Sequence, residues 1–270
     1  MKPGSPANVS QSVHTTAQST THQHLRSNVA GVYIDDLTEQ EAITRIKDLA
    51  SGGRGHYMVV VNAAKAVAAE QDHRLREIIS RADIVTADGM SVVWASRLLG
   101  RPLRERVTGI DLFEKLMACA AESGQSVFLL GARQDVVVAA AEVFKRRHSL
   151  LKIVGLHDGY FEDGASLSVA DQIRASGADL LFVAMGSPRQ ELWIAEHIDR
   201  SGVKFAMGVG GAFDHLAGYA QRAPRWMQQS GLEWLHRLSR EPRRLWRRYL
   251  LGNSRFLYII LRQAFIEKRR

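Results

Sequence analysis

The sequence predicts an α/β protein in which helices cover both faces of a mainly parallel sheet, with a basic helical appendage at the C-terminal end. Between residues 29 and 220, short apolar runs rich in β-branched residues alternate with longer stretches of helical composition. These runs are nearly continuous, as expected for strands that are buried on both faces. After residue 220 the strand pattern stops, and Trp and Arg become frequent. Together these features indicate a Rossmann-like core followed by a separate helical segment.

The individual elements can be placed along the chain. A first strand is expected at residues 32–34, and Thr38 with Glu41 forms a capping box that opens a helix through about residue 50. Further strands are expected at residues 57–61, 83–86, 126–130, 152–154, 180–185 and 204–209. Helical composition fills residues 64–80, 110–122, 135–148 and 189–200.

The composition suggests three regions. Residues 1–28 are rich in Ser, Thr, Gln and His and contain neither an acid nor an apolar run, which predicts a disordered leader without a signal peptide. Residues 29–220 form the predicted core, and residues 221–270 the appendage. Overall, 46% hydrophobic and 24% charged residues exclude a wholly disordered or fibrous chain.

Cysteine content restricts the chemistry. Cys119 is the one cysteine among the 270 residues, which excludes a disulfide framework and a multi-cysteine metal cluster. Because Cys119 lies in an apolar helical run, we expect a buried thiol rather than a nucleophile. The chain therefore suits a reducing compartment, most simply the cytoplasm.

The positive charge is concentrated in the appendage. The formal net charge is +8, yet the last 49 residues alone hold 13 Lys and Arg against 3 acids. Such a segment needs an anionic partner, namely lipid head groups, phosphates or nucleic acid. Its longest uncharged apolar run, residues 256–261, is far below the ~20 residues that cross a bilayer. Interleaved Arg and aromatic residues favour a helix lying in a membrane interface; a helical cap packed on the core is the alternative, and both can hold together.

Candidate ligand-binding residues follow the predicted strands. In an open parallel sheet, ligands bind beyond the carboxyl ends of the strands. The residues at those ends are Asn62, Asp88-Gly89, Gly131, the run from Gly186 to Glu191, and the run from Gly210 to Asp214.

Familiar nucleotide and metal motifs are missing. The sequence has no G-x-G-x-x-G fingerprint after an early strand, no P-loop, and no Asp-x-Asp pair for a metal-bound diphosphate. A bound diphosphate would therefore be neutralised by Arg side chains and by backbone N–H groups at helix starts, with no metal and no cofactor.

Several spaced motifs carry a resemblance to a known family. They are Ala87-Asp88-Gly89, Arg106-Val107-Thr108-Gly109-Ile110-Asp111, Gly186-Ser187-Pro188-Arg189-Gln190-Glu191, Gly210-Gly211-Ala212-Phe213-Asp214, Arg222-Ala223-Pro224 and the run from Gly231 to Leu238 with Glu241-Pro242. In this order they resemble the WecG/TagA/CpsF family of bacterial glycosyltransferases, over roughly residues 29–250. The leader and Asn62-Ala63-Ala64-Lys65 resemble most its xanthan-type glucosyltransferase branch. Relatives often carry Thr where this chain has Val60, so a hydroxyl contact is missing or replaced here.

The resemblance implies a reaction and its partners. It implies inverting, metal-independent transfer of glucose, N-acetylmannosamine or its uronic acid from a UDP-sugar donor. The acceptor would be a polyprenyl-pyrophosphate-linked saccharide for cell-surface glycan or exopolysaccharide synthesis. The enzyme would be peripheral on the cytoplasmic face of the inner membrane and would bind its anionic surface. No nucleic-acid partner is expected, and a homo-oligomer is left open.

Two residues are candidates for catalysis. Asp88 is the expected general base, because inversion needs a carboxylate that deprotonates the attacking hydroxyl. The alternative for Asp88 is a cap on the following helix through the N–H of Ser91. Asn62 could hydrogen-bond the donor sugar or the acceptor, or could simply stabilise a turn.

Other residues are candidates for substrate binding. Arg106 could hold phosphate beside a helix start formed by Thr108 and Gly109, with Asp111 nearby; an Arg–Asp surface pair with a Thr cap is the alternative. Gln190 could read uracil or ribose, whereas Glu191 could merely favour the helix dipole. The remaining candidates are Gly131, Gly186, Gly210 and Gly211 for close backbone approach, Asp214 for the nucleoside, and Arg222, Arg225, Arg237 and Arg240 for the diphosphate, with lipid contact as the alternative for these arginines.

Two other function classes stay open from the residues alone. A Rossmann-like sheet also suits an NAD(P)-dependent oxidoreductase, although the glycine fingerprint fails. The basic appendage also suits a nucleic-acid-binding module, although the core is slightly acidic and carries no RNA-binding motif.

Overall fold

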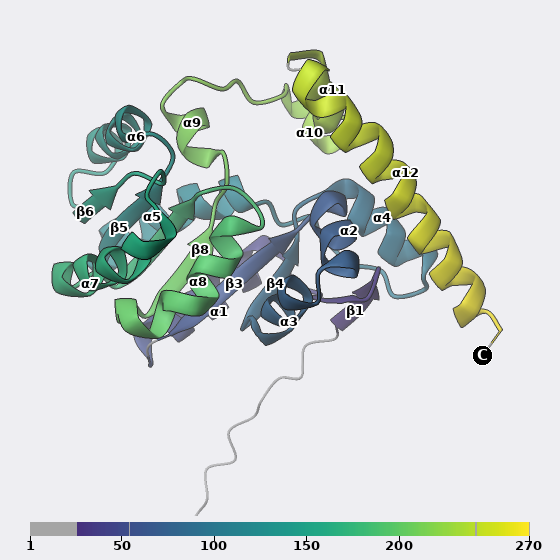
Figure 1. Ribbon diagram of the computed structural model, residues 1–270, viewed down its shortest axis with the longest axis horizontal. Helices are drawn as coiled ribbons and strands as arrows, with labels where there is room; N and C mark the ends of the chain where they lie inside the picture. The colour runs from purple at the N-terminus through teal and green to yellow at the C-terminus, as the bar shows by residue number, and fades with distance from the viewer. Residues whose placement is uncertain (1–25, 54, 241, 270) are drawn as a thin grey trace, which may run out of the picture.

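The computed structural model describes residues 26–53, 55–240 and 242–269, nine of them between residues 225 and 249 by their backbone alone. A parallel sheet of six strands forms its centre (Figure 1). The strands are β3 (His56–Val61), β4 (Ile84–Ala87), β5 (Ser126–Gly131), β6 (Lys152–His157), β7 (Leu180–Ala184) and β8 (Phe205–Gly208). Their spatial order is β4-β3-β8-β7-β5-β6, and every neighbouring pair is parallel. This confirms the predicted α/β class.

Two further strands lie outside this sheet. β1 (Arg26–Val29) and β2 (Val32–Asp35) form an antiparallel hairpin. The buried carboxylate of Asp35 accepts hydrogen bonds from the N–H of Val85 in β4 (2.8 Å) and from Arg26 Nε (2.8 Å), which ties the hairpin to the edge of the sheet. The predicted strand at residues 32–34 thus belongs to a separate hairpin, and its partner β1 begins inside the predicted leader. Residues 1–25 of that leader lie outside the described part of the chain.

Helices cover both faces of the sheet. Alternate residues of β3 enter two different buried clusters, Val59 and Val61 in one, Met58 and Val60 in the other, because successive side chains of a strand point to opposite faces. The first cluster packs under α2 (Ala63–Gln71), α3 (His73–Arg81), α4 (Met90–Leu98), α7 (Ser166–Ser176) and α8 (Arg189–Ser201). The second packs under α1 (Glu39–Ser51), α5 (Gly109–Ser123), α6 (Gln134–Arg147) and α9 (Ala212–Leu216).

The helix predicted from the capping box is confirmed, whereas the single helix predicted at residues 64–80 is wrong. Both hydrogen bonds of the Thr38–Glu41 capping box are present at the start of α1. The single helix expected at residues 64–80 is instead two, because the side chain of Asp72 accepts from the N–H groups of Arg74 (2.9 Å) and Leu75 (3.1 Å) and starts α3. An Asp inside a helical pattern favours such a restart because its carboxylate competes for backbone N–H groups.

The C-terminal segment is helical, as predicted, and its last helix is docked on the core. It comprises α10 (Arg225–Gln229), α11 (Glu233–Arg240) and α12 (Pro242–Glu267). α12 lies against α2 (Figure 1), and its Phe256 and Ile260, 6% and 2% exposed, join the core. Gln263 Nε2 donates to the carbonyl of Asn28 (3.0 Å), while its Oε1 accepts from the N–H of Ala30 (2.9 Å). The helical-cap interpretation is therefore confirmed.

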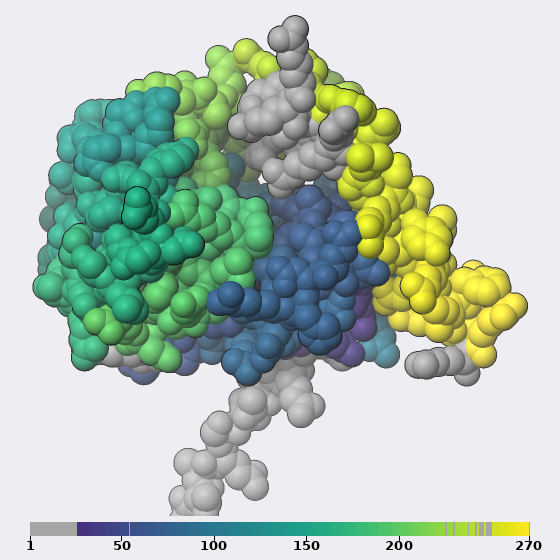
Figure 2. All heavy atoms as spheres, in the orientation of Figure 1, coloured from purple at the N-terminus to yellow at the C-terminus, as the bar shows by residue number. Residues whose placement is uncertain are grey.

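The side of α12 that faces away from the core exposes apolar side chains instead of burying them. In the space-filling view α12 is a separate ridge, coloured yellow, beside the N-terminal half of the core (Figure 2). Large apolar side chains are exposed along it: Trp246, Leu250, Leu251, Leu257, Tyr258, Leu261, Phe265 and Ile266. Within the described residues, no helix has both the length and the apolar character that crossing a membrane requires.

Candidate active site

Asn62 and Asp88 are neighbours at the carboxyl-terminal edge of the sheet. Val61 and Ala87, the last residues of β3 and β4, are paired in register, and the N–H of Asp88 donates to the carbonyl of Val61 (2.9 Å). Because all six strands are parallel, the residues after β5, β7 and β8 lie at the same edge. The strand ends thus bring the two candidate catalytic residues side by side.

One oxygen of Asp88 holds the start of α5. Its Oδ1 accepts from the N–H of Gly109 at 3.0 Å. The alternative, a cap on α4 through Ser91, is wrong: the N-cap of α4 is Gly89, and α4 has no side-chain cap. Among the described residues none donates a hydrogen bond to Oδ2 of this partly exposed carboxylate. Asp88 therefore has one anchored oxygen and one that is available to a ligand.

Asn62 begins α2. Its Oδ1 accepts from the N–H of Lys65 (3.0 Å), so the turn-stabilising interpretation is confirmed. The side-chain amide NH2 of Asn62 donates to no described residue and can still contact a substrate. Two residues earlier, the buried Val60 packs against the backbone of Gly109, where a Cβ would lie 3.3 Å from its Cγ2. An apolar contact thus occupies this position.

The alternative interpretation, a pair between Arg106 and Asp111, is wrong: each residue instead contacts the C-terminal segment. Arg106 Nη1 donates to Glu233 Oε2 in α11 (3.2 Å). Asp111 accepts from Arg222 through both oxygens, at 2.5 and 2.7 Å, and from the hydroxyl of Thr108 at 2.6 Å. Thr108 is the N-cap of α5, as predicted. Burial raises the pKa of Asp111, but the hydrogen bonds from Arg222 and Thr108 outweigh it and hold that pKa below its usual value.

The four appendage arginines are only partly described. Arg222 lies partly buried against α5, where its hydrogen bond with Asp111 raises the pKa of the guanidinium. The exposed Arg240 donates to the side chain of Gln221. The side chains of Arg225 and Arg237 lie outside the described part of the chain.

Beneath the site lies a buried polar network. Lys65 Nζ in α2 donates to Glu191 Oε1 in α8 (2.7 Å), and the two side chains are 5% and 2% exposed. Gln190 Nε2 donates to the same oxygen (2.9 Å), and Gln190 Oε1 accepts from the N–H of Gly210 (3.0 Å). Both the nitrogen and the oxygen of the Gln190 side-chain amide are thus engaged inside the protein. This arrangement gives Gln190 and Glu191 a positioning role for the loop after β8. A contact between Gln190 and uracil or ribose stays a prediction.

Sequence reasoning missed Lys65 as a member of this network. The signal that could have found it is a lone cation among alanines, in the run Ala63-Ala64-Lys65-Ala66 of a strand-following helix. A buried Lys needs an acidic partner, and Glu191 follows β7, which is separated from β3 by β8.

The predicted glycines fall into two groups. At Gly131 (φ +128°) a Cβ would lie 2.5 Å from the backbone of Ala184, so this glycine allows β5 and β7 to approach closely. Beside Gly186, Gly210 and Gly211, a Cβ would meet no atom within 4 Å. The second group therefore borders open space, as a backbone contact with a ligand requires. Asp214 in α9 is partly exposed.

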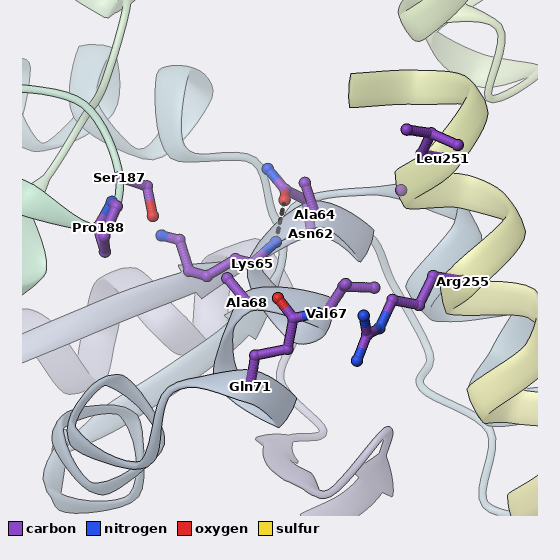
Figure 3. Close-up of a pocket in the computed structure, with 11 residues that line it drawn as sticks. Asn62, Ala64, Lys65, Val67, Ala68, Gln71, Ser187, Pro188, Leu251 and Arg255 are labelled. Carbon is purple, nitrogen blue, oxygen red and sulfur yellow. Dashed lines mark hydrogen bonds between the residues drawn. The ribbon is translucent and has the colours of Figure 1, made fainter. Parts of the chain in front are cut away.

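A cavity of about 440 Å³ adjoins Asn62 (Figure 3). It lies between α2, the loop before α8 and α12. Its lining residues are Asn62, Ala64, Lys65, Val67, Ala68, Gln71, Ser187, Pro188, Leu251, Gly252 and Arg255. Lys65 and Ser187 face each other on one side, and Leu251 and Arg255 project from α12 on the other.

Among the described residues, no three His, Cys, Asp or Glu side chains are grouped so that they could hold a metal ion. Metal independence itself stays a prediction.

Comparison with known proteins gives two findings. The sequence model of the glycosyl transferase WecG/TagA/CpsF family matches residues 27–270. A protein of Bacillus spizizenii, named N-acetylglucosaminyldiphosphoundecaprenol N-acetyl-beta-D-mannosaminyltransferase, is 38% identical over 197 residues, which are 73% of this chain and 76% of that protein.

Proposed function

The chain belongs to the WecG/TagA/CpsF family of glycosyl transferases, and on that premise we propose that it moves a sugar, with inversion, from a UDP-sugar to a saccharide carried by a polyprenyl diphosphate. The name of the Bacillus relative supports an acceptor of this kind. The observation that carries the proposal is Asp88: one oxygen is anchored to Gly109, the other is available, and Asn62 and a cavity lie beside it. The family match gives no support to an oxidoreductase or to a nucleic-acid-binding module.

Asp88 acts as the general base. The acceptor hydroxyl oxygen attacks the anomeric carbon, and the bond from that carbon to the β-phosphate oxygen breaks. UDP leaves with the bonding electron pair, and Oδ2 of Asp88 takes the hydroxyl proton. Such proton transfer is typically worth about 10²–10⁴ in rate. The N–H of Gly109 keeps the carboxylate oriented while this happens.

The donor binds beside α5 and the loop after β8, on the face of the sheet opposite to α2. The open space at Gly210 and Gly211 suits backbone contact with UDP, and the partly exposed Asp214 suits its ribose hydroxyls. Arg106 and Arg222 both lie near the N-terminus of α5, whose dipole favours an anion. Each is paired with a carboxylate, Glu233 or Asp111, so a diphosphate that binds here without a metal ion shares or displaces these partners.

For the donor sugar we favour N-acetylmannosamine, the sugar in the name of the Bacillus relative. Glucose, which the xanthan-type resemblance implies, and the uronic acid of N-acetylmannosamine are the competing donors. The xanthan-type branch and a homo-oligomer stay predictions.

The enzyme works at the cytoplasmic face of the membrane, where a polyprenyl-linked acceptor resides. The exposed apolar side chains along α12 support an interfacial location, since such a stripe can be buried at the level of the lipid head groups. The many arginines of the appendage add attraction to anionic lipids.

Release of UDP tests the proposal. Purified protein is mixed with each UDP-sugar, a short polyprenyl-diphosphate-linked N-acetylglucosamine and EDTA. We expect acceptor-dependent UDP release that persists in EDTA and falls about 100-fold or more in Asp88→Asn. Asn retains the Oδ1 that accepts from Gly109, so the variant keeps the local fold. Absence of release with every donor from well-folded protein, or full activity in Asp88→Asn, contradicts the proposal.

A further inference from the structure

The proposed function assigns no ligand to the cavity between α2, the loop before α8 and α12. We propose that it binds the diphosphate and the first isoprene units of the acceptor lipid. The inference rests on the proposed function, and it adds residues that belong to neither the catalytic pair nor the donor side.

Its position fits an acceptor. Asn62 belongs to the cavity wall and is adjacent to Asp88 across the paired ends of β3 and β4. The acceptor hydroxyl must reach Asp88, and the diphosphate is attached to the same saccharide. The cavity therefore lies beside the base, on a side from which a saccharide attached to the diphosphate can present its hydroxyl.

Its charge fits an anion with an apolar tail. The lining contains two cations and no acid; Lys65 is already paired with the buried Glu191 (2.7 Å), so Arg255 is the cation that can meet an incoming anion. Arg255 Nη2 donates to Glu70 (2.9 Å), and the side-chain oxygen of Gln71 also accepts from its guanidinium. The side chain nevertheless remains 47% exposed, so a diphosphate can replace or share these surface partners. The rest of the wall is mainly apolar, through Val67, Ala68, Pro188 and Leu251.

The α12 wall connects the cavity to the proposed membrane surface. Leu251 lines the cavity and is also 65% exposed, so it belongs to both surfaces. Its neighbour Gly252 leaves space: a Cβ there would meet no atom within 4 Å. Figure 3 shows this stretch of α12 facing Asn62 and Ala64 across the cavity. An isoprenoid chain that starts here would continue along the exposed leucines of α12.

Its size also fits. The volume of about 440 Å³ lies within the range of about 300–1,000 Å³ that small-molecule sites occupy. None of the donor-side candidates Gly210, Gly211, Asp214 and Arg222 belongs to the lining. The UDP-sugar and the lipid diphosphate can therefore be bound at the same time.

Farnesyl diphosphate, a soluble lipid diphosphate, is the probe, and calorimetry on the full chain is the measurement. We expect binding that UDP does not displace and that neither farnesol nor inorganic pyrophosphate reproduces. Gly252→Leu and Ala68→Leu fill the cavity from opposite walls and should weaken farnesyl diphosphate about tenfold or more while leaving UDP affinity unchanged. Ala175→Leu places the same side chain on the exposed side of α7, outside the cavity lining, and is the matched control.

Several results would overturn the inference. They are equal farnesyl diphosphate affinity in Gly252→Leu and Ala175→Leu, displacement of the probe by UDP, absence of binding to the wild-type protein, or equally tight binding of dioctanoyl phosphatidate at the same cavity. Sugar transfer separates this inference from the proposed function. If the wild-type protein transfers sugar and Gly252→Leu leaves the KM of the lipid-linked acceptor unchanged, the inference fails and the function stands. If no UDP-sugar supports transfer, the function fails, whatever farnesyl diphosphate does.

Discussion

Arg222 and Asp111 form a two-point ion pair across 111 residues of sequence, with Nη1–Oδ1 at 2.5 Å and Nη2–Oδ2 at 2.7 Å. The planar guanidinium matches the carboxylate, which makes this geometry more specific than a Lys contact could be. Together with the contact of Arg106 to Glu233, it fastens the start of the C-terminal segment to the N-terminus of α5. The segment that carries the candidate diphosphate-binding arginines is thus held beside the active site by the core.

Asp111→Asn should change how stability depends on pH. The pKa of Asp111 is lowered in the folded protein, so its contribution is present above the unfolded-state pKa of about 3.9 and is lost as pH falls through the folded pKa. We expect the wild-type protein to exceed Asp111→Asn in free energy of unfolding by about 1 kcal/mol at pH 7, since the pair is partly exposed. The gap should close below about pH 4. Urea unfolding at several pH values measures it, and a gap that widens in acid would contradict the assignment.

Lys65→Met should be among the most destabilising single changes at the site. It leaves the carboxylate of Glu191, 2% exposed, without its cation, which should cost about 3–5 kcal/mol. The double variant Lys65→Met/Glu191→Gln removes both charges and should recover much of the loss. Urea unfolding of both variants and of Glu191→Gln completes a double-mutant cycle. A double variant no more stable than Lys65→Met would show that the ion pair is not the cause.

Gly131→Ala should destabilise the fold rather than affect ligand binding alone. Its Cβ would lie 2.5 Å from the backbone of Ala184, and the residue has φ +128°. We expect a loss of about 3 kcal/mol or more in the free energy of unfolding. Gly186→Ala is the matched control, because φ is also positive there but no atom lies within 4 Å. It should cost only about 1 kcal/mol. Equal costs at the two sites would contradict the close-approach argument.

The outer side of α12 should bind anionic vesicles. Leu250, Leu257 and Leu261 are each more than half exposed and lie on one side of the helix, since spacings of seven and four residues return to the same face. Changing all three to Glu should weaken binding to phosphatidylglycerol vesicles about tenfold or more, because each buried Leu contributes about 1.5–3 kcal/mol.

Three exposed leucines elsewhere provide the control for this experiment. Changing Leu98, Leu150 and Leu167 to Glu alters net charge equally but leaves α12 intact. Co-sedimentation with vesicles should separate the two triple variants, and added salt should weaken binding of the wild-type protein. Equal binding by both variants would place the membrane contact outside α12.

Much of the fold could be predicted because it is encoded locally. A few consecutive residues are enough to predict the continuous apolar strands, the capping box of Thr38 and Glu41, and the residues that end the strands. The structure has these features where they were expected. The errors were also local. Asp72 restarted a helix that its neighbours' composition would have continued, and residues 32–34 paired with a strand inside the predicted leader.

The sequence by itself determined the parallel sheet, the edge where Asn62 and Asp88 lie, and the concentration of positive charge near the C-terminal end. Periodicity and turn chemistry act over a few residues, and they are sufficient for these features. The tertiary structure alone decided that Asp111 pairs with Arg222 rather than Arg106, that Lys65 pairs with Glu191, and that α12 packs on α2. These contacts join segments more than 100 residues apart, and their partners depend on how the layers stack. Local sequence patterns contain no information on that stacking, and neither the cavity beside Asn62 nor the anchored oxygen of Asp88 exists without it.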